Sequence, residues 1–169
     1  MRYIYIDGYN ILNSWPNLKP KNDTEFEGAR QSLIEKMQNY GGYNGDNIFI
    51  IFDAHLVQGS LEKEEIVGNV TVVFTKEGET ADSYIERTVN NLGRRKNVLV
   101  VTNDSLEQQL IFQRGAIRMS SLEFYHEVKN IEKTIKEQTK LLSYRKTDRI
   151  EDSLDEKILK KLEKMRRGC

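Results

Sequence analysis

The chain has 169 residues, and its 26 basic and 26 acidic residues balance, so the total charge excludes no class of partner. This length suits one domain with room for a core and one appended element. The single cysteine, Cys169, excludes an internal disulfide, which fits a reducing compartment. No apolar stretch approaches the roughly 20 residues that a membrane-spanning helix needs. We therefore expect a soluble, cytoplasmic protein with no membrane partner.

The charges are unevenly distributed along the chain. Residues 1–128 hold 13 Lys or Arg and 18 Asp or Glu, a net charge of −5, whereas residues 129–169 hold 13 and 8, a net charge of +5. A basic tail can contact a polyanion. The alternative, from charge alone, is a solvated helical tail without such a partner.

Short apolar runs alternate with helical patterns along the chain. The apolar runs predict strands at about residues 3–6, 48–52, 70–74, 97–102 and 116–119. Helical spacing and capping residues predict helices at about 24–40, 82–92, 105–112, 122–141 and 153–167. Two segments are predicted to be irregular, 11–22 with both prolines and 54–69 with one helical turn around 61–66. This alternation is typical of an α/β fold with a mostly parallel sheet.

Acidic residues follow several of the predicted strands. Asp7 and Asp53 directly follow the first two strands, and Gly8 supplies the backbone freedom that a turn after Asp7 requires. Three further acids stand after later strands or at the start of a helix: Glu79, Asp82 and Asp104. Because the carboxyl ends of parallel strands share one edge of a sheet, these carboxylates should converge there. Each alone has a structural role as a cap or turn residue, but the whole set would repel itself without a cation.

The donor types of this cluster point to a hard cation. Oxygen ligands suit Mg²⁺ or Mn²⁺, and the two histidines, His55 and His126, lack the spacing of zinc ligands. Such an ion, held by carboxylates, suits hydrolysis of a phosphodiester. The chain has no P-loop, no Gly-x-Gly-x-x-Gly and no Gly-x-Ser-x-Gly elbow. A phospho-acceptor receiver domain is disfavoured by Gly8 and Ser120, which stand where such domains carry an acid and a lysine.

Five stretches together resemble a known family. They are Ile-Asp-Gly-Tyr-Asn-Ile at 6–11, Phe-Asp-Ala-His at 52–55, Gly-Glu-Thr-Ala-Asp at 78–82, Thr-Asn-Asp at 102–104 and Gly-Ala-Ile-Arg-Met-Ser at 115–120. In this order they resemble the NYN domain, a branch of the PIN-like ribonuclease superfamily, and above all its bacterial YacP-like members. The resemblance covers about residues 2–125. Asn103 is a departure, because relatives often carry Ser there.

The resemblance implies a three-layer α/β/α sandwich with a flavodoxin-like, about five-stranded sheet. It implies a nuclease domain over residues 1–125 and leaves 126–169 as a basic helical extension. Asp7, Asp82 and Asp104 match the family's acidic positions, and Asn10 matches the polar residue beside the first of them. With Asp53 and Glu79 in support, these residues would bind one or two Mg²⁺ or Mn²⁺ ions and cleave RNA.

The YacP-like group is similar to an endonuclease that acts on messenger RNA in the ribosomal aminoacyl site, which makes messenger RNA and the ribosome expected partners. Candidate phosphate contacts in the body of the protein are Lys76, Arg94, Arg95, Lys96 and Arg118. Candidate contacts to ribosomal RNA in the tail are Lys157, Lys160, Lys161, Lys164, Arg166 and Arg167. Two other functions stay open, a non-catalytic RNA- or ribosome-binding module and a phosphomonoesterase or nucleotidase on the same sheet edge.

Overall fold

The computed structural model describes residues 1–54, 59–94, 96–103, 115–166 and 168, and the side chains of 148–155 and 159 lie outside this description. The predicted helix at 105–112 therefore falls outside the described residues. The chain divides into two compact units, Met1–Ile131 and Glu132–Cys169. Within the described ranges, no helix combines the length and the apolar character that crossing a membrane requires.

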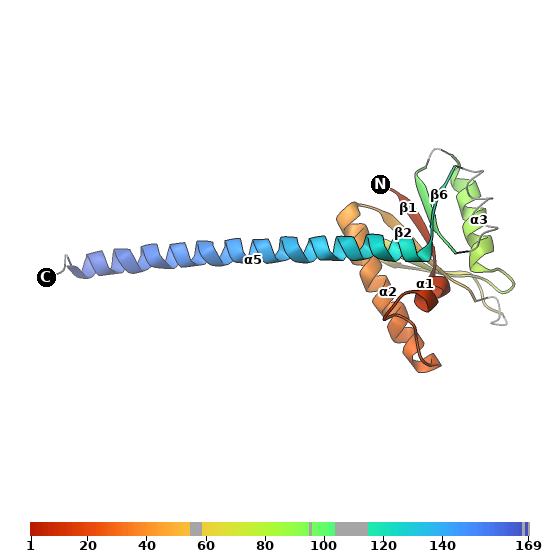
Figure 1. Ribbon diagram of the computed structural model, residues 1–169, viewed down its shortest axis with the longest axis horizontal. Coiled ribbons are helices and arrows are strands. Elements are labelled where there is room, and N and C mark those ends of the chain that lie inside the picture. The colour runs from red at the N-terminus through yellow and green to blue at the C-terminus, as the bar shows by residue number, and fades with distance from the viewer. Residues whose placement is uncertain (55–58, 95, 104–114, 167, 169) are drawn as a thin grey trace. The chain divides into compact units, whose positions relative to one another are not determined.

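The first unit alternates strands and helices in chain order. The strands are β1 (Tyr3–Asp7), β2 (Asn47–Phe52), β3 (Lys63–Val67), β4 (Val70–Phe74), β5 (Val98–Val101) and β6 (Ile117–Met119). The helices are α1 (Gly8–Ser14), α2 (Asp23–Asn44), α3 (Ala81–Leu92) and α5 (Ser121–Arg166), of which the last continues into the second unit (Figure 1).

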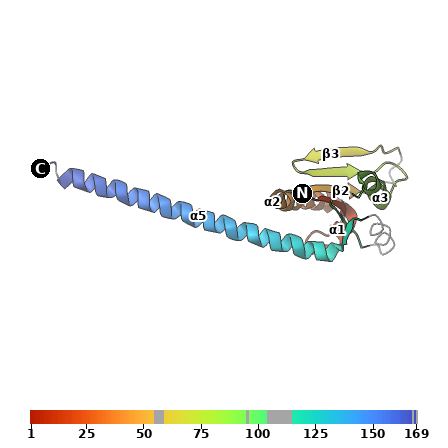
Figure 2. The ribbon, with the colours of Figure 1, turned by 90° about the horizontal axis from the view of Figure 1, so that it is seen from above.

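The strands form one sheet in the order β3-β4-β2-β1-β5-β6. All neighbouring pairs are parallel except β3 with β4, and Figure 2 shows β3 at the edge of the sheet, antiparallel to its neighbour. The expected mostly parallel α/β architecture is confirmed, with six strands among the described residues in place of about five. The carboxyl ends of β1, β2, β4 and β5 consequently lie at one edge.

Alternating side chains of the central strands pack against helices on both faces of the sheet. In β1, Ile4 and Ile6 belong to a cluster with α1, α2 and the start of α5, whereas Tyr5 belongs to a second cluster with α3. Both clusters are buried, which explains why these strands read as continuous apolar runs. The sheet is thus the middle layer of three, with α3 on the opposite face from α1 and α2 (Figure 1).

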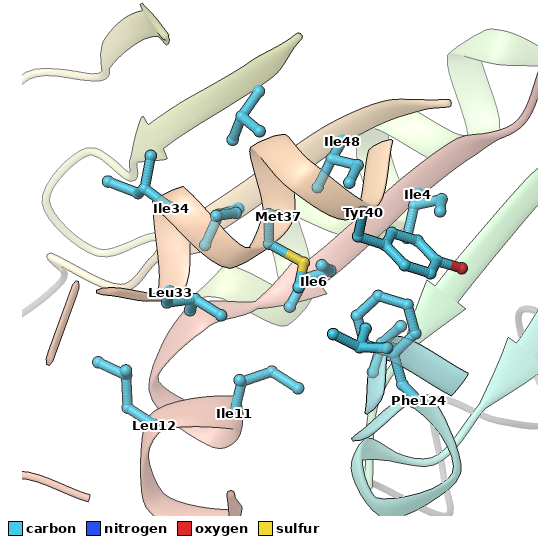
Figure 3. Close-up of a cluster of buried hydrophobic side chains, with 14 of the residues drawn as sticks. Ile4, Ile6, Ile11, Leu12, Leu33, Ile34, Met37, Tyr40, Ile48 and Phe124 are labelled. Atoms are coloured by element: carbon cyan, nitrogen blue, oxygen red, sulfur yellow. The ribbon is translucent and has the colours of Figure 1, made fainter. Parts of the chain in front are cut away.

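The larger cluster joins four elements around the first strand. Figure 3 shows Met37 of α2 beside Ile6 of β1, with Phe124 of α5 facing Tyr40. The rings of Tyr40 and Phe124 meet edge to face with their centroids 5.4 Å apart. The first turns of α5 are therefore part of the core of the first unit, and this packing holds the start of α5 beside the ends of β1 and β5.

The segment predicted to be irregular at 54–69 contains a strand. β3 pairs with β4 in a hairpin whose last pair is Val67 with Val70, and Gly68, with φ of 64°, makes the turn. The side chains of β3 are mostly exposed, so it carries charged residues and lacks the apolar alternation of a half-buried strand. The Gly68-Asn69 pair between two runs was the available signal for a hairpin.

Residues 8–14 form helix α1, where the sequence pattern predicted a turn and a loop. Asp7 is its N-cap. Gly8 lies within the helix and has no positive φ, so the predicted role in an unusual backbone is wrong. A Cβ atom at this position would lie 2.4 Å from Cε1 of Phe52. Glycine is therefore required by the close approach of α1 to the end of β2.

Helix α5 is continuous from Ser121 to Arg166, whereas the sequence pattern predicted two helices separated by residues 143–152. That polar stretch contains neither proline nor glycine. Polar residues alone do not end a helix, because most of them tolerate helical backbone at a cost of well under about 1 kcal/mol each.

Candidate functional site

Three of the predicted acids lie at the carboxyl edge of the sheet. Asp7 is the last residue of β1, Asp53 directly follows β2, and Asp82 is in the first turn of α3, which follows β4. The three strands are neighbours and run parallel. The sheet order therefore brings together side chains that are far apart in the sequence.

Asp7 also has a structural role in the helix that follows it. Its carboxylate caps α1 by accepting the backbone N–H of Asn10 at 3.1 Å. Burial, together with the negative charges of Asp82 and Asp53, raises the pKa of Asp7 to about 6, while backbone hydrogen bonds act in the opposite direction. Mutual repulsion of this kind is expected where carboxylates share a site that a cation neutralises.

The donor chemistry fits a hard divalent ion held by few protein ligands. The described part of the chain contains no group of three or more His, Cys, Asp or Glu side chains arranged to hold a metal ion. Mg²⁺ commonly keeps several waters and uses one or two carboxylates together with substrate phosphates, so Asp7 and Asp82 are sufficient in number. Asp104, the third predicted ligand, lies outside the described residues.

Glu79 is placed differently from the other predicted ligands. It is only 9% exposed, and its carboxylate accepts hydrogen bonds from Nε of Arg87 at 3.0 Å and from Nη2 at 3.3 Å. Arg87 also pairs with Glu62 at 3.0 Å. This pairing neutralises Glu79, which makes it a weaker candidate for a metal ligand than Asp7.

The predicted polar residue Asn10 lies between Asp7 and the end of β5. Its side-chain oxygen accepts a hydrogen bond from Nδ2 of Asn103 at 3.0 Å. Asn103 follows β5, the other neighbour of β1 in the sheet. The sequence pattern marked Asn103 only as a departure from relatives, because pairing between two asparagine side chains 93 positions apart has no sequence signature.

Two residues that sequence reasoning missed shape the same edge. Thr75, fully buried, accepts the backbone N–H of Ala54 at 3.0 Å through Oγ1, which fixes the chain next to Asp53. Arg30 of α2 places its guanidinium 5.1 Å from the ring centroid of Phe74 and 5.7 Å from that of Phe52. Phe52 and Phe74 end their strands, so Arg30, which also pairs with Glu27 of its own helix, places its guanidinium at the edge that holds the carboxylates.

The predicted phosphate contacts of the first unit are dispersed. Lys76 is exposed just beyond the end of β4, at the same edge as the carboxylates. Lys96 precedes β5 and places its ammonium 5.2 Å from the ring centroid of Tyr3, the first residue of β1. Lys96 and the exposed Arg94 thus belong to the amino ends of the strands, away from the carboxylates, while Arg118 is half-buried within β6.

The predicted contacts of the tail belong to the second unit. Its described members are exposed on α5: Lys157, Lys160, Lys161, Lys164 and Arg166. Spacings of three, four and seven residues place four of them, Lys157 to Lys164, on one side of the helix. Arg167, like Arg95 in the first unit, lies outside the described residues.

Comparison with known proteins identifies close relatives. The model of the YacP-like NYN domain family matches residues 4–167. Protein YacP of Bacillus subtilis (strain 168) is 42% identical over 172 residues, which cover 99% of this chain and 98% of that protein. The crystal structure of Rae1 (YacP) from Bacillus subtilis is similar with a TM-score of 0.74 at 41% identity, covering 99% of this chain and 96% of the other. The crystal structure of a variant of that protein, with one tryptophan replaced by leucine, gives a TM-score of 0.72 at 37% identity. This match covers 85% of this chain and 84% of the other.

Proposed function

This chain belongs to the YacP-like NYN domain family, and from that premise we propose that it is a divalent-metal-dependent endoribonuclease. The observation that carries the proposal is the position of Asp7, half-buried beside Asp53 and Asp82 at the carboxyl edge of the sheet, with its pKa raised to about 6. A protein maintains such repulsion where a bound cation offsets it. Asp7 and Asp82 would hold Mg²⁺ or Mn²⁺, together with Asp104 from beyond the end of β5.

When bound, the ion would lower the pKa of water and offset negative charge on the scissile phosphate. Asn10 would contact the phosphate or the attacking water, because its backbone N–H binds Asp7 and its side chain is neutral. Arg30 and Lys76 would attract the RNA backbone toward an edge that is otherwise acidic. The pairing of Glu79 with Arg87 would keep the first turn of α3, and with it Asp82, in place.

The proposed substrate is messenger RNA on the ribosome, in the cytoplasm. Supporting this, the exposed basic side chains of α5 form one positive face of the second unit, suited to phosphates of ribosomal RNA: Lys157, Lys160, Lys161 and Lys164. This face gives the protein a way to bind the ribosome that is independent of the acidic site.

The first experiment compares RNA cleavage by the wild type and Asp7→Asn, with Mg²⁺, Mn²⁺ or EDTA, on free RNA and on translating ribosomes. We expect metal-dependent cleavage that falls by about 100-fold or more in Asp7→Asn, since that change removes a charge opposite the ion. Wild-type protein that binds ribosomes but cuts neither substrate would instead be a binding module. Hydrolysis of free nucleotides alone would indicate a phosphomonoesterase.

A second experiment tests the ribosome as a partner. Replacing the four lysines of the basic face with glutamine should weaken ribosome binding by about tenfold or more at moderate salt and leave cleavage of free RNA unchanged. The control replaces three exposed lysines nearer the start of the same helix, where a smaller effect is expected: Lys133, Lys136 and Lys140. Equal ribosome binding by the wild type and the four-lysine variant would contradict this part of the proposal.

A further inference from the structure

A chain of hydrogen bonds connects Asn10 to the start of α5 through Asn103. The backbone N–H of Ser121, the first residue of α5, donates to Oδ1 of Asn103 at 3.0 Å. Nδ2 of Asn103 donates in turn to Oδ1 of Asn10 at 3.0 Å. At the other end, the backbone N–H of Asn10 donates to Oδ1 of Asp7 at 3.1 Å. This series of hydrogen bonds thus ends at the Asp7 carboxylate, which the proposed metal ion requires.

The direction of these hydrogen bonds follows from the first donor. A backbone N–H only donates, so the atom of Asn103 that faces Ser121 must be the side-chain oxygen. The NH₂ group of Asn103 therefore faces Asn10, whose facing atom must be an acceptor. Consequently the oxygen of the Asn10 side chain is engaged, and its NH₂ group is the end that remains for a ligand.

Ser121 is itself held firmly by the helix that carries Asn10. Its side chain is buried, its carbonyl oxygen accepts Nε1–H of Trp15 at 2.9 Å, and its hydroxyl contacts that of Ser14. Ser14 ends α1 and Trp15 is its C-cap. The donor that orients Asn103 is therefore immobilised by α1. The same helix carries Asn10, so both ends of this series of contacts are fixed by α1.

We propose that Asn103 is a positioning residue, which orients the Asn10 side chain so that its NH₂ group donates to a phosphate oxygen of the RNA. In this orientation Asn10 offers its NH₂ group to the phosphate, while its oxygen, which already accepts one hydrogen bond from Asn103, is not assigned to the metal ion. The inference rests on the proposed ribonuclease function and assigns Asn10 the role of phosphate donor. A neutral donor suits this position, since a cationic side chain beside Asp7 would pair with the carboxylate.

A purely structural role for Asn103 makes a different prediction. The N–H of Ser121 is one of the groups that a helix start leaves without a partner in its own helix, and Asn103 satisfies it. If that were its whole role, Asn103→Asp would preserve function, because a carboxylate accepts this hydrogen bond equally well near the positive end of the helix. However, the carboxylate cannot donate to Asn10, so the same change removes the orientation that we propose.

The test measures single-turnover RNA cleavage by Asn103→Asp, Asn10→Ala and the double variant. We expect a loss of about 100- to 1,000-fold for either single change, the range for one missing donor to a developing oxyanion. We expect the double variant to match Asn10→Ala within about twofold, because residues that act through one another are not additive. Additive losses in the double variant would overturn the inference.

Two controls separate orientation from charge and stability. Asn13→Asp adds the same negative charge to an exposed position of α1 and should leave the cleavage rate within about twofold of wild type. With Mg²⁺ present, the melting temperature of Asn103→Asp should match that of wild type, because the cap of α5 is preserved and the ion offsets the added charge. Slower cleavage by Asn13→Asp would contradict an orienting role. So would a loss of cleavage in Asn103→Asp that is accompanied by a fall in its melting temperature.

Metal affinity gives an independent readout, measured by calorimetric titration with Mn²⁺. Asn10→Ala should bind Mn²⁺ as wild type does, whereas a tenfold weaker affinity would show that Asn10 is a ligand and overturn the inference. If the wild type cleaves no RNA, the proposed function fails. The inference is then judged by affinity for a single-stranded RNA oligonucleotide, which Asn10→Ala and Asn103→Asp must both weaken; unchanged affinity overturns it.

Discussion

Acidic side chains at the two ends of the central strands have different neighbours. At the amino ends, Asp46 is only 4% exposed, and its carboxylate accepts hydrogen bonds from the backbone N–H of Arg2 at 2.8 Å and from its guanidinium at 2.8 and 3.1 Å. At the carboxyl ends, Asp7 lies beside Asp53 and Asp82, whose charges raise its pKa. One end pairs an acid with a base, and the other gathers acids.

The difference separates stability from function within one sheet. The pair at the amino ends also binds Tyr40 of α2 and Glu127 of α5 through Arg2, so it connects β1 to two helices. Such a network stabilises the fold because every buried charge has a partner. At the other end, burial and the charges of Asp53 and Asp82 disfavour the ionised form of Asp7, which lowers the stability of the metal-free protein and is expected where a cation binds.

The largest effect on stability is expected from Arg2→Ala. This change leaves Asp46, whose side chain is 3% exposed, without its guanidinium partner. Removing one partner of a buried pair typically lowers the free energy of unfolding by about 3–5 kcal/mol. Urea denaturation at pH 7 checks this, with Arg94→Ala, at an exposed position, as the control that should change it by less than about 0.5 kcal/mol. Equal losses in the two variants would mean that the pair contributes nothing specific.

Asp7→Asn is expected to increase the free energy of unfolding of the metal-free protein, in contrast to Arg2→Ala. The pKa of Asp7, about 6 in the folded state, lies above its ordinary value of 3.8, so the folded state binds this proton more tightly than the unfolded state does. Ionisation therefore destabilises the fold as the pH rises from about 4 to 6, and the full penalty applies above about pH 6. The variant should gain up to about 3 kcal/mol at pH 8 and almost nothing near pH 4.

Denaturation of the metal-free protein as a function of pH checks this prediction. Asparagine retains the acceptor that caps α1, so the loss of a cap does not obscure the gain. Glu35→Gln, which removes an exposed acid from α2, should show no such pH-dependent gain. A variant that is less stable than wild type at pH 8 would show that the gathered carboxylates do not strain the fold.

Gly8→Ala tests the close packing beneath the carboxylates. The new Cβ atom would meet three ring atoms of Phe52 at 2.4–2.8 Å, so α1 or the ring must move. Overpacking of this kind typically costs about 1–3 kcal/mol. Gly28→Ala in α2, where no atom lies within 4 Å of the new methyl group, should instead stabilise by up to about 1 kcal/mol. Thermal unfolding of both variants checks the difference in sign, and a stabilised Gly8→Ala would contradict it.

The smallest effect on stability is expected from Tyr40→Phe, near the amino ends of the central strands. The hydroxyl accepts a hydrogen bond from Arg2 at 2.9 Å and contacts the carboxylate of Glu127. Its loss should lower the free energy of unfolding by about 1 kcal/mol, because Arg2 and Asp46 remain paired. Tyr43→Phe, on the same helix and 44% exposed, is the control and should be neutral. A larger loss of free energy in Tyr43→Phe than in Tyr40→Phe would contradict the stabilising role of the Tyr40 hydroxyl.

The candidate site was predictable wherever it depends on the ends of strands. β1, β2 and β4 are buried on both faces and read as apolar runs. The positions of Asp7 and Asp53 at the ends of β1 and β2, and of Asp82 at the start of the helix after β4, therefore followed from the pattern alone. The continuity of α5 and the existence of β3 did not follow. Both depend on exposed polar segments, where the hydrophobic period that identifies elements is absent.

By itself, the sequence determined the alternation of strands and helices, the mostly parallel sheet and the acids at its carboxyl edge, because local periodicity and strand direction encode all three. Only the tertiary structure decided which of those groups interact. The pairing of Asn10 with Asn103, that of Glu79 with Arg87 and the approach of Gly8 to Phe52 depend on how the elements pack. Hydrogen bonds and close contacts act over a few ångströms in space, and residue order does not encode those distances.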